Sequence, residues 1–144
     1  MASVGALYTP EVLALATGLA ALPLDPAMAL QGSARSASCG SRVDLSLTVD
    51  AGGRIERIGL RAQACAIGQA AAAIFAGAAE GRDRDELAAA LANLEAWLAG
   101  TSPLPNWPAL DTIAAAQAFP GRHGAILLAW KAALEALPSA DASR

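Results

Sequence analysis

The clearest structural signal in the sequence is at residues 42–50, which read Arg42-Val43-Asp44-Leu45-Ser46-Leu47-Thr48-Val49-Asp50. Its apolar residues occupy every second position, which is the pattern of a half-buried strand. Because Asp44 stands at an alternate position, we expect it to point to solvent. Turn residues follow at 50–53, and the next apolar residues predict a hairpin partner whose spacing slips once, as at a β-bulge: Ile55, Ile58 and Leu60.

A weaker strand signal precedes this hairpin at residues 33–37, and helices are predicted outside it. Thr9, Pro10 and Glu11 form an N-cap, an N1 proline and an acidic first turn, and Pro23 ends that helix. After the hairpin, residues 66–79 form an alanine-rich helix, residues 83–100 a helix with a capping box, and further helices follow through Leu110 and from residue 126 to 137. The order predicts an α+β fold, a small antiparallel sheet of about three strands with helices packed on one face plus an N-terminal helix.

The bulk properties limit the class of protein. With 144 residues and no linker-like segment, the chain is expected to form a single domain over residues 1–144. A net charge of −3 and scattered basic residues argue against nucleic acid as a partner. The N-terminus has no basic signal region, and no apolar run reaches the length of a membrane span. We therefore expect a soluble, cytoplasmic protein without a membrane partner.

Two cysteines are the main candidates for chemistry. Cys39 lies in Ser38-Cys39-Gly40-Ser41, just before the alternating strand, and Cys65 lies just before the alanine-rich helix. Unpaired N–H groups and the positive dipole end at a helix start favour a thiolate, which binds metal or carries sulfur. In a reducing cytosol such a pair is metal-binding, redox-active or simply buried. Both cysteines are therefore candidates for one reactive site.

Three groups of residues, in this order, resemble the U-type iron–sulfur cluster assembly scaffolds, the IscU and SufU proteins and the NifU N-terminal domain. They are Ser38-Cys39-Gly40, residues 58–67 through Cys65-Ala66-Ile67, and Phe119-Pro120-Gly121-Arg122 with residues 128–132. The resemblance implies a scaffold or carrier rather than an enzyme. It implies a transient iron–sulfur cluster, or a single metal ion such as iron or zinc, bound through Cys39 and Cys65. Its implied partners are a cysteine desulfurase and acceptor apo-proteins, and its implied oligomeric state is a monomer or weak homodimer.

The chain departs from that family at two ligand positions. Ser41 stands where the family carries an aspartate, and Ala125 stands where it carries a third cysteine. His123, the only histidine, lies two residues before Ala125 and is a candidate third metal ligand, or equally a helix-start residue bonded to backbone. Cys39, Cys65 and His123 supply three donors at most, which indicates an open, labile site or one shared between subunits rather than a closed four-ligand site.

Two other functions stay open on the residues alone. One is a degenerate scaffold-like module that binds or regulates a cysteine desulfurase system without a competent cluster site. The other is a thiol enzyme in which Cys39 is the nucleophile and Cys65 resolves. No hydrolase triad, P-loop or dinucleotide fingerprint is present in the sequence.

Overall fold

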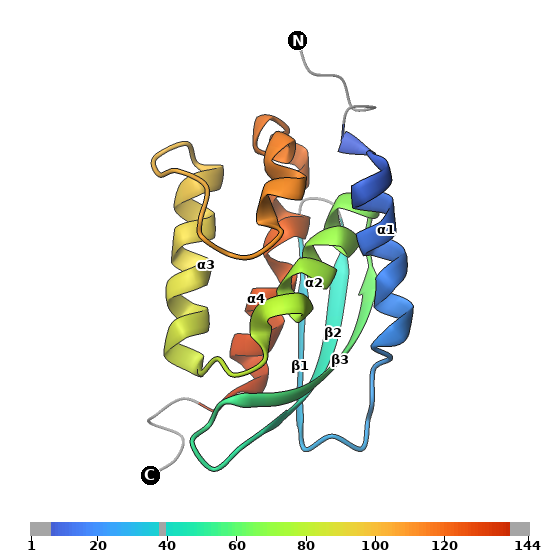
Figure 1. The fold of residues 1–144 in the computed structure, drawn as a ribbon, viewed down its shortest axis with the longest axis vertical. Helices are drawn as coiled ribbons and strands as arrows, with labels where there is room; N and C mark the ends of the chain where they lie inside the picture. Colours follow the sequence, from blue (N-terminus) through green and yellow to red (C-terminus); the bar gives the residue numbers. More distant parts are fainter. Residues whose placement is uncertain (1–6, 38–39, 139–144) are drawn as a thin grey trace.

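A three-stranded antiparallel sheet is the centre of the fold in a computed structural model that describes residues 7–37 and 40–138. The strands β1 (Leu30–Arg35), β2 (Arg42–Val49) and β3 (Ile55–Gln63) lie in the order of the sequence. Helices α2 (Ala66–Ala79) and α4 (His123–Ala136) pack on the sheet, and α1 (Pro10–Gly18) packs beside α2 (Figure 1). The α+β class, with a small meander and an N-terminal helix, is confirmed.

The β2–β3 hairpin follows the sequence pattern closely. Asp50 accepts hydrogen bonds from the N–H groups of Gly52 and Arg54, each at 2.9 Å, and Gly53 adopts the left-handed φ of 78° that the turn requires. The register shifts at the Thr48/Val49 step, which confirms the bulge. Strand β1 begins at Leu30 instead of residue 33, because its pairing with β2 starts at Leu47 and its own side chains carry little strand signal.

The helix boundaries reflect local caps. Thr9 accepts a hydrogen bond from the Val12 N–H at 3.2 Å and begins α1, which ends at Gly18 and continues as the 3-10 helix η2 (Leu19–Ala21). Asp83 and Glu86 form the predicted capping box at the start of α3 (Arg84–Leu98). The segment through Leu110 is a 3-10 helix, η3 (Leu110–Ala118), and η4 (Pro120–Arg122) leads into α4.

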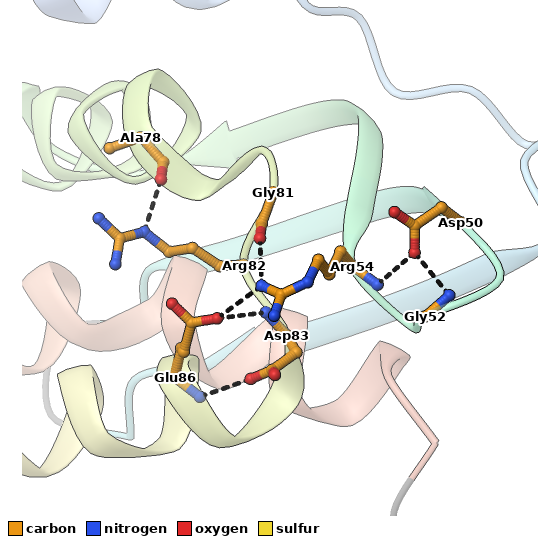
Figure 2. Close-up of polar contacts among 8 residues, drawn as sticks. All are labelled: Asp50, Gly52, Arg54, Ala78, Gly81, Arg82, Asp83 and Glu86. Carbon is orange, nitrogen blue, oxygen red and sulfur yellow. Dashed lines mark hydrogen bonds and ion pairs between the residues drawn. The ribbon is translucent and has the colours of Figure 1, made fainter.

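The connection between α2 and α3 is tied to the hairpin, as Figure 2 shows. Gly81, with φ of 85°, donates its N–H to the Ile55 carbonyl at 2.8 Å, and Ile55 in turn donates to the Arg82 carbonyl at 2.9 Å. Arg54 reaches from the hairpin turn to the Gly81 carbonyl at 2.9 Å and to Glu86 at 3.0 Å. These contacts fix the start of α3 relative to the sheet.

Helix α4 is the central element of the core. It contacts β1, β2, α2 and α3, and most of its side chains are buried. Trp130 is fully buried against the rings of Phe75 and Trp107, with centroid separations of 5.3 and 5.2 Å. Trp97 is buried as well, so the three tryptophans are core residues.

The second face of the sheet is crossed by the segment that joins η2 to β1. Leu22 accepts a hydrogen bond from the Leu60 N–H at 2.8 Å, and Ser46 Oγ accepts one from the Asp25 N–H at 3.0 Å. Gly59 lies under this segment, where a Cβ would meet the Pro23 carbonyl oxygen. The helices therefore cover one face, and the crossing segment covers the middle of the other.

The expectation that Asp44 points to solvent is wrong. Its side chain does lie on the face away from the helices, but two arginines cover it and the residue is only 7% exposed. Arg42 contacts Oδ1 through Nε and Nη2 at 2.9 Å each, and Arg61 contacts Oδ2 at 3.0 Å. Burial raises the pKa of Asp44, but the hydrogen bonds from Arg42 and then Arg61 outweigh it and hold the pKa below 3.8.

Candidate functional site

Cys65 is the N-cap residue of α2. Its backbone is extended, with φ of −65° and ψ of 170°, and its carbonyl accepts the first helical hydrogen bond, from the Gln69 N–H at 2.9 Å. Within the described chain its sulfur makes no capping bond, and the residue is half-buried and outside any disulfide. The expected position at a helix entrance is confirmed, and Cys65 also packs against the edge of the hydrophobic core.

The backbone that presents Cys65 is held on both sides. The Gln69 side chain donates to the Ala64 carbonyl at 2.9 Å, which closes the residues around the cysteine into a compact turn. Gly68, one turn into α2, is buried, and a Cβ on it would lie 2.7 Å from the Ala64 Cβ and 3.1 Å from the Ala125 Cβ. Glycine is favoured there mainly because a Cβ would clash with Ala64, and the contact with Ala125 shows that α2 and α4 also meet closely at that point.

Ala125 therefore stands beside the helical turn that Cys65 begins. It lies in the first turn of α4 and is 2% exposed. By the resemblance this is the position of a third cysteine, so the fold brings that position to the start of α2 but places a methyl group there. A buried methyl offers a metal no donor.

His123 is the first residue of α4, two residues before Ala125. Its Nε2 lies 2.8 Å from the Gln117 carbonyl oxygen, and the ring is partly buried. Since a carbonyl only accepts, Nε2 carries the proton in this contact, which leaves Nδ1 as the nitrogen with a lone pair when the ring is neutral. The backbone-bonded alternative is thus observed, and a ligand role for His123 stays a prediction.

Cys39 lies outside the described residues, so the predicted convergence of Cys39 with Cys65 stays a prediction. Hydrogen bonds join the described residues on either side of it: Ser36 donates its N–H to the Ser41 carbonyl at 2.8 Å, and Gly40 donates to the Ser36 carbonyl at 2.9 Å. Gly40 has the left-handed φ of 71°. Ser41 is buried at 7% exposure.

The described residues do not form a metal site by themselves. Across residues 7–37 and 40–138, no group of three or more His, Cys, Asp and Glu side chains is placed to hold a metal ion. A hollow of about 530 Å³ lies between α1 and α2, and another of about 460 Å³ lies beside residues 21–25. Cys65 lines neither of them. Any metal at Cys65 therefore needs donors from the Cys39 segment, from solvent or from a partner.

Sequence reasoning missed one polar group near this end of the sheet. Arg42 pairs with Gln63 across β2 and β3, and Cys65 follows Gln63 by two residues. The ion pairs of Arg42 and Arg61 with Asp44 therefore lie close along the chain to both cysteine segments. The signal was present in the sequence, because Arg42 and Asp44 are two apart on a strand and so share a face.

In the described part of the chain, no helix has both the length and the apolar character needed to cross a membrane.

Comparison with known proteins finds solved structures that are similar to this chain, but no match in sequence. No protein-family model matches the chain, and no curated protein matches it in sequence. Among solved structures, it is similar to a nitrogen-fixing NifU-like protein (N-terminal) from Brucella abortus, with a TM-score of 0.81 and 23% identity over 90% of this chain and 91% of that one.

Two further solved structures are similar. A candidate iron–sulfur cluster assembly scaffold protein for the SUF system from Fervidobacterium islandicum matches with a TM-score of 0.82 and 20% identity, over 94% of this chain and all of that one. A hypothetical protein matches with a TM-score of 0.72 and 21% identity, over 88% of this chain and 96% of that one. The fold of the U-type scaffolds, which the resemblance implied, is therefore the fold of this chain.

Proposed function

We propose that this protein is a scaffold or carrier in iron–sulfur cluster assembly that holds metal, cluster or persulfide sulfur through Cys39 and Cys65. The shared fold with a NifU-like and a SUF-system protein over nine-tenths of the chain supports this class of function. The observation that carries the proposal is Cys65 itself, a half-buried free cysteine at the N-cap of α2, whose first turn meets the first turn of α4 at Gly68 and Ala125.

The donor set favours temporary binding of the cargo. Two thiolates with at most one imidazole leave coordination positions open, so the metal or cluster is exchanged more readily than from a closed four-sulfur site. Because protonation removes each thiolate, binding weakens as the pH falls. If sulfur arrives as a persulfide, the Cys65 thiolate attacks the outer sulfur of the donor, the donor cysteine leaves as its thiolate, and the outer sulfur stays on Cys65.

The partners implied by this function are a cysteine desulfurase that supplies sulfur and apo-proteins that accept the cluster. The protein performs no turnover of its own in this proposal, acts in the cytoplasm and works as a monomer or weak homodimer. If the His123 ring keeps its contact with the Gln117 carbonyl, Nε2 carries the proton, and His123 completes the donor set through Nδ1.

The test is anaerobic reconstitution with ferrous iron, L-cysteine and a cysteine desulfurase, followed by desalting and assay of iron and acid-labile sulfide. The wild type should retain both, and Cys39→Ser and Cys65→Ser should each lose most of them. Ser102→Ala, in the exposed loop after α3, is a control that should load as the wild type does. A wild type that retains neither metal nor sulfur would exclude the proposal.

A second function is favoured by one observation. Ala125 fills a buried position beside Gly68 in the first turn of α2, and no group of three donors among the described residues can hold a metal. On this second reading the protein is a degenerate scaffold-like module that binds or regulates a cysteine desulfurase system without carrying a cluster. Desulfurase binding that survives replacement of both cysteines, in a protein that loads no iron or sulfide, would select it over the first.

A further inference from the structure

The face of the sheet away from the helices carries a concentration of positive charge in an acidic protein. Register places Arg35 opposite Arg42 and Arg42 opposite Gln63, and one row further it places Ser33, Asp44 and Arg61 side by side. Residues paired across antiparallel strands point to the same face. Three arginines and one aspartate therefore share the end of this face that leads into both cysteine segments, although the whole chain has a net charge of −3.

The arginine side chains are exposed, and the Asp44 carboxylate holds two of them in place. The Arg42 and Arg61 side chains are 40% and 59% exposed, whereas the Asp44 side chain between them is 11% exposed. Arg42 uses Nε and Nη2 on Asp44, and Arg61 uses Nη2, so each guanidinium has further N–H donors. A buried carboxylate thus orders two guanidinium groups, which lowers the entropy cost of binding a second oxyanion.

A hollow of about 250 Å³ adjoins this group. Ser33, Asp44 and Arg61 line one part of it, and Glu135 of α4 lines another. Glu135 adds negative charge to the lining of the hollow that Arg61 borders, so the donors free for an oxyanion are those that the arginines present outside it.

We propose that the surface formed by Arg35, Arg42 and Arg61 docks an acidic protein partner, whose carboxylates bind the ordered guanidinium groups and place that partner beside the cysteine segments. This inference deepens the proposed function and rests on it, because the partner is the protein that delivers sulfur to the cysteines. Arginine is suited to this task because its planar fork binds a carboxylate through two hydrogen bonds. Charge complementarity sets the orientation and speeds the encounter.

The direct test uses a fluorescent peptide of alternating glutamate and serine as the probe, with binding measured by anisotropy at rising NaCl concentration. The wild type should bind, and its affinity should fall steeply with salt. The double variant Arg35→Glu/Arg61→Gln should bind at least about tenfold more weakly. A single-stranded oligonucleotide of the same charge is the second probe and should bind more weakly than the peptide.

The matched control for Arg35→Glu is Lys131→Glu, which makes the same charge change at an exposed position of α4, outside the surface. It should stay within about twofold of the wild type. Arg35→Glu alone keeps the test valid if the double variant fails to fold, because Arg35 forms no ion pair with the described residues. Equal losses in control and test variants, tighter binding of the oligonucleotide, or no wild-type binding would each overturn the proposal.

The two proposals fail separately. A wild type that loads iron and sulfide but does not bind the acidic peptide would remove the docking surface and leave the carrier function. A wild type that binds the peptide through these arginines but loads neither iron nor sulfur would remove the carrier function. If both hold, Arg35→Glu/Arg61→Gln should load normally from free ferrous iron and sulfide, but more slowly than the wild type from a desulfurase.

Discussion

Replacement of Gly32 by alanine tests how closely α4 rests on the sheet. Gly32 lies in β1, opposite Leu45, on the face that the helices cover. A Cβ at this position would overlap the Ala132 carbonyl oxygen and lie 2.8 Å from the Ala136 nitrogen and 2.9 Å from the Ala136 Cβ. These are backbone atoms and a Cβ, which no side-chain rotation can move.

The magnitude follows from the size of that clash. Ordinary contact needs about 3.4 Å or more, so α4 must shift away from β1 and loosen the packing around Trp130. Overpacking of a well-packed core costs about 1–3 kcal/mol, and backbone contacts place this case at the upper end. Alanine in a strand recovers about 0.5–1 kcal/mol relative to glycine. The expected net loss is about 2 kcal/mol.

The assay is urea unfolding followed by tryptophan fluorescence, since Trp97, Trp107 and Trp130 are all buried. The midpoint should fall with little change in slope, and the melting temperature should drop by about 4–8 °C. Gly77→Ala is the matched control: it makes the same change inside α2, where a Cβ would meet nothing within 4 Å, and should stabilise by about 0.5–1 kcal/mol. A Gly32→Ala protein as stable as the wild type would refute the close packing of α4 on β1.

Three further predictions concern the polar groups and the site. Asp44→Asn should lower the free energy of unfolding by about 1–2 kcal/mol at neutral pH, a modest loss because the exposure of both arginines weakens their ion pairs with Asp44. In the wild type the stabilisation by the Asp44 carboxylate is fully present above the pKa of the unfolded state, about 3.9, and is lost as the pH falls through the lowered pKa of the folded state. Acid unfolding of both proteins measures this difference. Ala125→Cys should raise zinc affinity at least about tenfold in a chelator competition, whereas Ala125→Ser should not. Cys65→Ser should lose most of its cargo loading yet change the free energy of unfolding, measured in urea, by less than about 0.5 kcal/mol, because the thiol makes no capping bond.

Local signals account for the parts of the fold that the sequence predicted well. The alternation at 42–50, the turn at Asp50 and the Asp83–Glu86 capping box each arise from residues a few positions apart, and each is observed. The same holds for Cys65, whose place before an alanine-rich helix makes it the N-cap. Such features depend on backbone geometry that neighbouring residues determine.

Long-range contacts account for the differences. Strand β1 owes its position to pairing with β2 and to the approach of α4 at Gly32, neither of which its small residues signal. Asp44 is buried because Arg61, from the next strand, closes over it. The approach of Ala125 to the start of α2 joins segments more than fifty positions apart, so periodicity could not predict it and only the resemblance implied it.

Zinc K-edge X-ray absorption of the anaerobically loaded protein shows whether both cysteines bind one metal ion, because it counts the sulfur ligands on that ion. We expect about two sulfurs at about 2.3 Å per bound zinc, falling to one in Cys65→Ser and one in Cys39→Ser. A first shell of nitrogen and oxygen alone, unchanged when either cysteine is replaced, would contradict a shared thiolate site.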